Sequence, residues 1–84
     1  MISIKESENF IRIFDFVMTK KKSNVVKKLI KDLDCEIVDC ELDGDDIESL
    51  DYSSIFKAID KINEDVFCFE ILLKKRGKTW QSTL

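Results

Sequence analysis

The chain has no histidine and no proline among its 84 residues. Histidine is the commonest general base and metal ligand, and its charge changes near neutral pH. Its absence argues against most enzymes, against a histidine metal site and against a histidine pH switch. No catalytic, metal-binding or nucleotide-binding motif is present either. We therefore expect a non-enzymatic protein with no catalytic residue, no cofactor and no metal.

The sequence also has little that would direct a chain to a membrane or to export. No apolar run reaches the roughly 18 residues that a membrane-spanning helix needs, and Met1–Glu8 has neither the basic start nor the apolar core of a signal peptide. A cytoplasmic protein is expected. The three cysteines, Cys35, Cys40 and Cys68, form no CxxC pair and lie in apolar runs, which favours reduced, packed thiols.

The composition indicates one small folded domain over residues 1–84. A chain this short cannot assemble a second hydrophobic core. The 44% hydrophobic content outweighs the 37% of charged residues as an indicator of folding. No internal repeat or linker-like stretch marks a domain boundary.

Three segments are predicted to be helices. In Phe10–Met18, Arg12 and Asp15 fall on one polar stripe of a helix, whereas in a strand each of the two faces would carry one of these charges. A helix is therefore predicted there, although the aromatic and β-branched residues suit a strand. A second helix follows Ser23, with apolar residues on one face and lysines on the other. A third runs from Asp51 or Ser53 to about Asn63.

Three segments are predicted to be strands, the last of them near the end of the chain. Cys35–Leu42 alternates with a period of two and should be wet on one face. Val66–Leu73 is apolar except for Glu70, which indicates a central strand buried on both faces. Glu70 is expected to pair with Arg12 or a lysine, or to lie at an exposed part of its face. Lys78–Thr83 should add a last strand.

The expected fold class is therefore α+β, with the order α-α-β-α-β-β and a small three-stranded sheet, mixed in direction. A helix separates Cys35–Leu42 from Val66–Leu73, so these two strands can be parallel through a right-handed crossover. An antiparallel arrangement remains an alternative.

The stretch Asp32–Asp51 is the most unusual feature, because ten of its twenty residues are acidic and none is basic. Asp39, Glu41, Asp43 and Gly44 fit the first positions of a calcium-binding EF-hand loop. The twelfth position is Leu50, where the loop requires a glutamate, so a calcium site is not expected. Clustered like charges destabilise a compact domain, which suggests that a function maintains them.

The functional hypothesis is that this acidic stretch binds and inhibits a basic protein partner, in the manner of an immunity protein or antitoxin that neutralises a nuclease toxin. Tyr52 and Trp80 are candidate aromatic anchors, provided that either adjoins the acidic surface. The predicted contact residues are Asp39, Glu41, Asp43, Asp45, Asp46, Glu48, Asp51, Tyr52 and Trp80.

Two alternatives belong to other classes. Lys20–Lys31 holds six basic residues and no acidic one, and the sequence KKRGKTW at 74–80 places cations beside an aromatic residue, so a small nucleic-acid-binding protein is one alternative. The other is a subunit of a larger assembly, with Phe16 and Met18 forming an exposed apolar patch.

Overall fold

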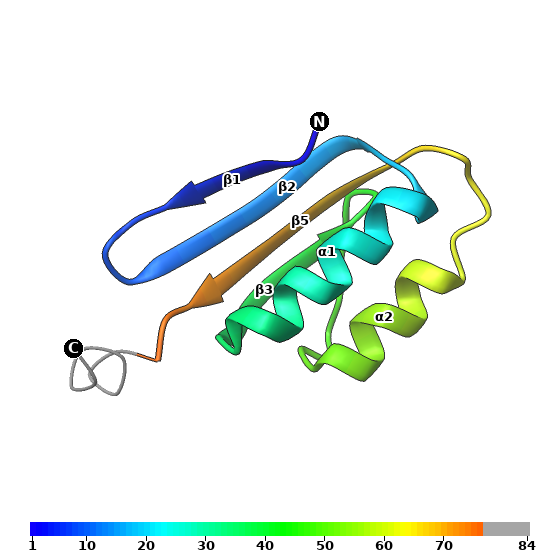
Figure 1. The fold of residues 1–84 in the computed structure, drawn as a ribbon. Helices are drawn as coiled ribbons and strands as arrows, with labels where there is room; N and C mark the ends of the chain where they lie inside the picture. Colours follow the sequence, from blue (N-terminus) through cyan, green and yellow to red (C-terminus); the bar gives the residue numbers. More distant parts are fainter. Residues whose placement is uncertain (77–84) are drawn as a thin grey trace.

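The computed structural model describes residues 1–76, which form two helices packed on one five-stranded antiparallel sheet (Figure 1). The strand order in the sheet is β1-β2-β5-β3-β4. The elements are β1 (Ser3–Glu6), β2 (Phe10–Met18), α1 (Lys20–Leu33), β3 (Glu36–Leu42), β4 (Asp45–Asp46), α2 (Tyr52–Asp60) and β5 (Phe67–Lys74).

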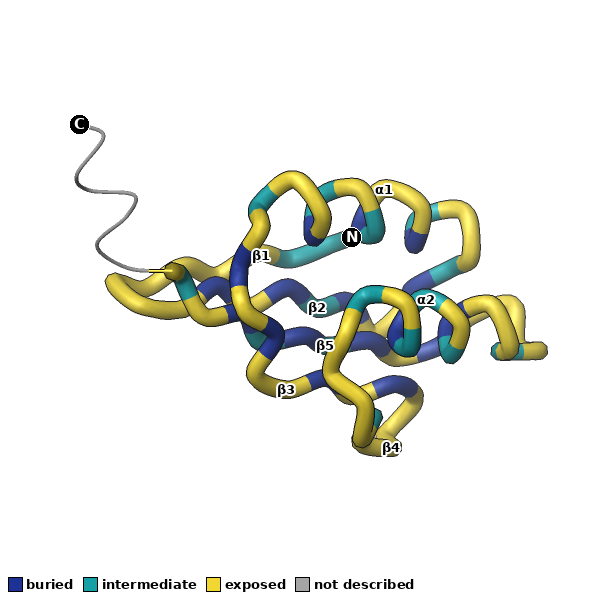
Figure 2. Tube along the Cα trace, turned by 90° about the horizontal axis from the view of Figure 1, so that it is seen from below, coloured by how far each residue is buried: buried dark blue, intermediate teal, exposed yellow. Residues whose placement is uncertain are grey.

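Both helices lie on the same face of the sheet, and the buried residues are concentrated between these two layers (Figures 1 and 2). The central strand β5 shows the alternation that this arrangement requires, because Phe67, Phe69, Ile71 and Leu73 are buried while the residues between them are exposed or half-buried. We call the side of the sheet that carries no helix the open face. Antiparallel sheets commonly leave one face to solvent in this way.

Side-chain caps define where the helices begin. The Thr19 hydroxyl accepts a hydrogen bond from the backbone N–H of Lys22 at the start of α1, and Asp51 accepts one from the N–H of Ser54 at the start of α2. Helix α1 ends at Leu33, and the capping residue that follows it, Asp34, adopts a left-handed conformation with φ 49°. The predicted second and third helices are thus confirmed, with α1 starting a few residues earlier than expected.

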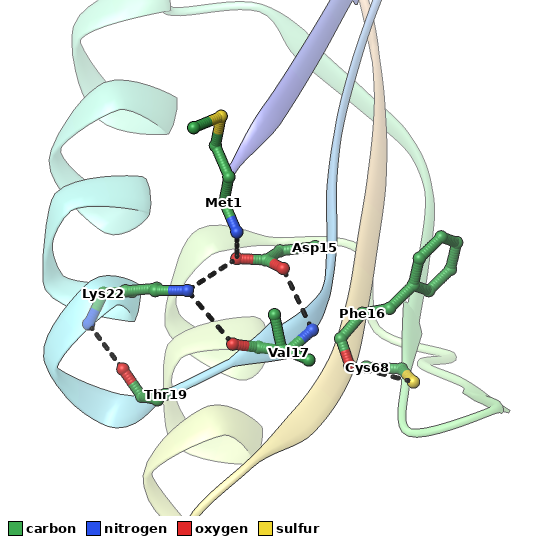
Figure 3. Close-up of polar contacts among 7 residues, drawn as sticks. All are labelled: Met1, Asp15, Phe16, Val17, Thr19, Lys22 and Cys68. Carbon is green, nitrogen blue, oxygen red and sulfur yellow. Dashed lines mark hydrogen bonds and ion pairs between the residues drawn. The ribbon is translucent and has the colours of Figure 1, made fainter.

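The prediction of a helix over Phe10–Met18 is wrong, because this segment is strand β2. The charge that argued against a strand, Asp15, is only 3% exposed and faces the helices. Its carboxylate accepts a hydrogen bond from the backbone N–H of Val17 at 2.9 Å and forms an ion pair with Lys22 of α1 at 3.3 Å (Figure 3). The Met1 ammonium lies 3.6 Å from it. A buried charge is compatible with a strand here because partners from other elements satisfy it.

The expected three-stranded mixed sheet and the parallel crossover are also wrong. Strand β3 pairs antiparallel with β5, and β2 and β5 are antiparallel as well. The reason lies between Leu42 and Phe67: the chain turns at Asp43 and Gly44, both with positive φ, runs back along the molecule, and returns through α2 (Figure 1). It therefore re-enters the sheet at the end where β3 finished.

The central position predicted for Val66–Leu73 is confirmed, since β5 lies between β2 and β3. Its burial on both faces is not, because Cys68 is exposed and Leu72 is half-buried on the open face. The strand predicted at Lys78–Thr83 lies outside the described residues.

Candidate protein-interaction surface

Cross-strand register arranges the open face in rows. Arg12 of β2, Leu72 of β5 and Asp39 of β3 are direct neighbours in one row. The next row contains Phe14, Glu70, Glu41 and Asp46. Directly paired residues project from the same face of a sheet, so these side chains share one surface although they come from four strands.

Three of the predicted contact residues, Asp39, Glu41 and Asp46, gather on this face, and we call them the acidic cluster. Partial desolvation raises the pKa of Glu41 above 4.5, and the negative charges of Asp46, Glu70 and Asp39 raise it further. No ion pair between described residues involves a member of the cluster. The repulsion among these carboxylates is therefore left uncompensated within residues 1–76.

Glu70, beside the cluster, does have a partner. The Arg12 guanidinium donates two hydrogen bonds to one Glu70 carboxylate oxygen, at 3.1 and 2.9 Å. This confirms the predicted pairing of Glu70 with Arg12. The pairing makes Glu70 a structural residue and gives no indication of an acid catalyst.

The remaining predicted acids are dispersed around the β3–β4 turn and the start of α2. Asp43 and Asp45 line an open depression together with Lys61 and Glu64. A hydrogen bond with Asp43 and the charge of Asp43 raise the pKa of Glu64. Glu48 is exposed in the following loop. The acidic stretch thus divides into a cluster on the sheet and a second group at its end.

Asp51 and Tyr52 have roles inside the fold. The Asp51 carboxylate accepts hydrogen bonds from the backbone N–H and the hydroxyl of Ser54, and these bonds lower its pKa. The Tyr52 hydroxyl donates to the carbonyl oxygen of Cys35 at 3.1 Å, and its ring is half-buried beside Phe56. Trp80 lies outside the described residues.

The sequence predicted only part of the aromatic surface on the open face: the exposure of Phe16 is confirmed, and its neighbour Phe14 was missed. Phe14 and Phe16 of β2 lie with ring centroids 5.8 Å apart, and Phe16 is 66% exposed. Lys5 and Arg12 lie over the Phe14 ring, at 5.8 and 5.3 Å from its centroid. The signal was the alternation of aromatic and charged residues, but it is visible only when the segment is read as a strand. Met18, predicted to share a patch with Phe16, is buried instead.

Several residues of the two basic stretches are already paired with other residues of the protein. Within Lys20–Lys31, Lys22 binds Asp15 and Lys27 binds Asp60 at 2.7 Å, while the Lys20 ammonium donates to the Asp60 carbonyl oxygen. In the 74–80 stretch, Lys75 pairs with Glu6 and Arg76 lies 4.0 Å from Asp34, and the residues from 77 onwards are not described. This arrangement gives less support to nucleic-acid binding than the sequence suggested.

The cysteines differ in environment. Cys35 and Cys40 are buried, and burial raises the pKa of the Cys40 thiol to about 12. Cys68 is exposed on the open face, where its Sγ lies 3.6 Å from the carbonyl oxygen of Phe16 (Figure 3). All three thiols are free. The expectation of packed thiols is confirmed for the first two and wrong for Cys68.

Among residues 1–76, no three cysteine, aspartate or glutamate side chains are grouped so that they could hold a metal ion. No helix in that part of the chain is long and apolar enough to cross a membrane. The chain matches no known protein family, no curated protein and no solved structure.

Proposed function

We propose that the chain is a non-enzymatic binding domain whose acidic cluster binds a basic protein partner. The observation that carries this proposal is that Asp39, Glu41 and Asp46 gather on one exposed face, where none of them forms an ion pair with a described residue and where neighbouring carboxylates contribute to raising the pKa of Glu41. Lysine or arginine side chains of a partner would remove the repulsion among these carboxylates on binding, and the field of the cluster would accelerate encounter.

The arrangement of the acidic cluster on a rigid support favours this class of partner. Asp39 and Glu41 are on a strand that pairs with the central strand, and Asp46 is held opposite Glu41 by the β3–β4 pairing. Carboxylates held in this way can occupy the positions that phosphates take on a nucleic-acid-binding surface. An inhibitor of a basic nuclease, of the immunity or antitoxin type, is therefore the function we propose.

The test uses the product of the neighbouring gene as the candidate partner. Association rates are measured at low and at high salt for the wild type and for the variant Asp39→Asn/Glu41→Gln/Asp46→Asn. We expect on the order of tenfold slower association of the variant at low salt and little salt dependence of what remains, because steering depends on unscreened charge.

The matched control is Glu8→Gln/Asp32→Asn/Asp65→Asn, which changes the net charge equally at exposed positions away from the open face. Equal rates for the two triple variants would overturn the assignment of the acidic cluster. Failure of the wild type to bind or inhibit this gene product would overturn the proposed nuclease-inhibitor function.

A further inference from the structure

A depression of about 410 Å³ lies beside α2, where the β3–β4 turn meets the loop that follows the helix. Leu42 and Asp45 are direct neighbours in the β3–β4 pairing, so both project from the same face of the sheet. Leu42 is buried in the core, which places this pair on the face that carries the helices. The depression is therefore separate from the acidic cluster on the open face, although Asp46 contributes to both.

The depression has an apolar floor and an acidic rim. The floor consists of buried and half-buried residues of the core and its margin, namely Leu42, Ile47, Ala58 and Ile62. The rim carries the Lys61 ammonium and four exposed carboxylates, those of Asp43, Asp45, Asp46 and Glu64. No ion pair between described residues involves any of these four carboxylates. Negative charge thus exceeds positive charge around an apolar floor.

Two further features favour a cation in this place. Helix α2 ends at the depression, since Ala58 in its last turn and the capping residue Lys61 both line it. The C-terminal end of a helix carries a partial negative charge, which adds to the field of the carboxylates. Asp43 and Glu64 also approach each other from the two sides, because a hydrogen bond with Asp43 and its charge raise the pKa of Glu64. A cation between them would relieve their repulsion.

The carboxylates are spread around the rim. Among residues 1–76, no three acidic or cysteine side chains are grouped so that they could hold a metal ion. An arginine side chain suits this arrangement better, because its guanidinium has five N–H donors in one plane and can bond several carboxylates at once. Its hydrocarbon stem can pack on an apolar floor while the charged end stays at the rim.

We propose that this depression binds an arginine side chain of the basic protein partner. The guanidinium would bond Asp45 and Glu64 at the rim, and the methylene groups would lie on Ile47, Ala58 and Ile62. This inference deepens the proposed function and rests on it, because that partner supplies the arginine. The acidic cluster would accelerate encounter, and the depression would then hold one side chain in place.

The test uses the pure protein and a small probe, N-acetyl-arginine methylamide, and follows backbone amide shifts by NMR during a titration. We expect the largest shift changes at residues 43–47 and 61–64. The control probe is N-acetyl-citrulline methylamide, which has nearly the same shape and no charge, and it should bind on the order of tenfold more weakly or not at all. Equal binding of the two probes, or shift changes largest at Asp39 and Glu41, would overturn the proposal.

A substitution in the floor separates a pocket from simple attraction of charge. Ala58→Leu fills the depression without changing any charge and keeps a good helix former in α2. It should weaken binding of the arginine probe on the order of tenfold or more, because the stem loses its place. The control is Ser53→Leu, which adds the same side chain at an exposed position of α2 away from the depression. Equal affinities of the two variants would overturn the proposal.

Substitutions at the rim test the charges. Asp45→Asn/Glu64→Gln should weaken binding of the arginine probe on the order of tenfold, whereas Glu8→Gln/Asp32→Asn, which changes the net charge equally at exposed positions elsewhere, should have little effect. Equal effects of the two double variants would overturn the proposal. Circular dichroism confirms that each variant is folded, and Asp45→Asn/Glu64→Gln decides if Ala58→Leu does not fold.

The outcome is distinguishable from that of the proposed function. If the probe binds in the depression and the product of the neighbouring gene does not bind the chain, the proposed function fails while the site for an arginine side chain stands. If that product binds the wild type and Asp45→Asn/Glu64→Gln with equal affinity, this inference fails while the proposed function stands.

Discussion

Asp15 shows how one residue can connect three parts of the chain. Its buried carboxylate links the end of β2 to Lys22 in the first turns of α1 and to the Met1 ammonium (Figure 3). Burial by itself raises the pKa of Asp15. The hydrogen bond from the Val17 N–H and the hydrogen bond and charge of Lys22 outweigh it, so the pKa lies below 3.8.

Replacement of Asp15 by asparagine should reduce the free energy of unfolding at neutral pH by about 1.5–3 kcal/mol, the typical value of hydrogen bonds to a charged group. The native pKa is below the unfolded one, so the stabilisation is complete above that unfolded value of 3.8 and is lost as the pH falls through the native pKa. The difference between wild type and Asp15→Asn should therefore shrink in acid. Urea unfolding at neutral pH and at about pH 2 measures it.

The control for this prediction is Glu48→Gln, an exposed carboxylate in the loop before α2. It should change stability little at either pH, because surface substitutions of this kind stay within about 0.5 kcal/mol. A difference between wild type and Asp15→Asn that is the same in acid as at neutral pH would show that the charge of Asp15 does not stabilise the fold.

At the scale of elements, substitutions within β2 can distinguish a strand from a helix over Phe10–Met18. In the strand, Ile13 is fully buried and Val17 is 52% exposed, whereas a helix would place both on its apolar side. Ile13→Ala should lower the free energy of unfolding by about 2–5 kcal/mol through loss of packing and creation of a cavity. Val17→Ala should cost no more than about 1 kcal/mol, the range of strand propensities. Chemical denaturation measures the free energy of unfolding of both variants. Equal losses of that free energy would favour the helix.

Elements with a clear period were predictable from sequence, and elements that depend on distant partners were not. The apolar face of α1 and the alternation of β3 from Asp39 to Leu42 are local patterns, so both were found. The register shift that exposes Val38 was not. The strand nature of β2 depends on Lys22 and the Val17 N–H satisfying Asp15, which no local pattern reveals. The direction of β3 relative to β5 depends on the course of the chain between Leu42 and Phe67, which composition does not specify.

The candidate surface was predictable in the same limited way. The exposure of Asp39 and Glu41 followed from the alternation of β3. Which acids share a face depends on register, and register separated Asp39, Glu41 and Asp46 from Asp43 and Asp45. In the structure Tyr52 is half-buried against the core, and its hydroxyl donates to the carbonyl oxygen of Cys35.

For the whole molecule, the uncompensated acidic cluster should make stability depend on salt. The net charge is −3, and the acids on the open face repel one another, so screening should raise the melting temperature between low salt and about 0.5 M NaCl. Glu41→Gln should show a smaller increase. Differential scanning calorimetry of both proteins at the two salt concentrations measures it.

The pH dependence of Glu41 should oppose that of Asp15. Its pKa is raised in the folded protein, so the native state binds its proton more tightly than the unfolded chain does, and stability falls as the pH rises above 4.5 through the native pKa. The control for the salt experiment is Glu8→Gln, which removes an exposed charge from the β1–β2 turn. A salt response of Glu41→Gln equal to that of the wild type would show that the cluster is not strained.

The central position of β5 sets the order in which the fold can be completed. Strand β2 pairs with β1 and β5, and β3 pairs with β4 and β5, so the two halves of the sheet have no backbone pairing with each other. During synthesis on the ribosome, the first 66 residues can form two separate subassemblies, each with an unpaired edge. The sheet becomes continuous only when Phe67–Lys74 inserts between them, and these sequence-distant pairings should make that insertion the slow step.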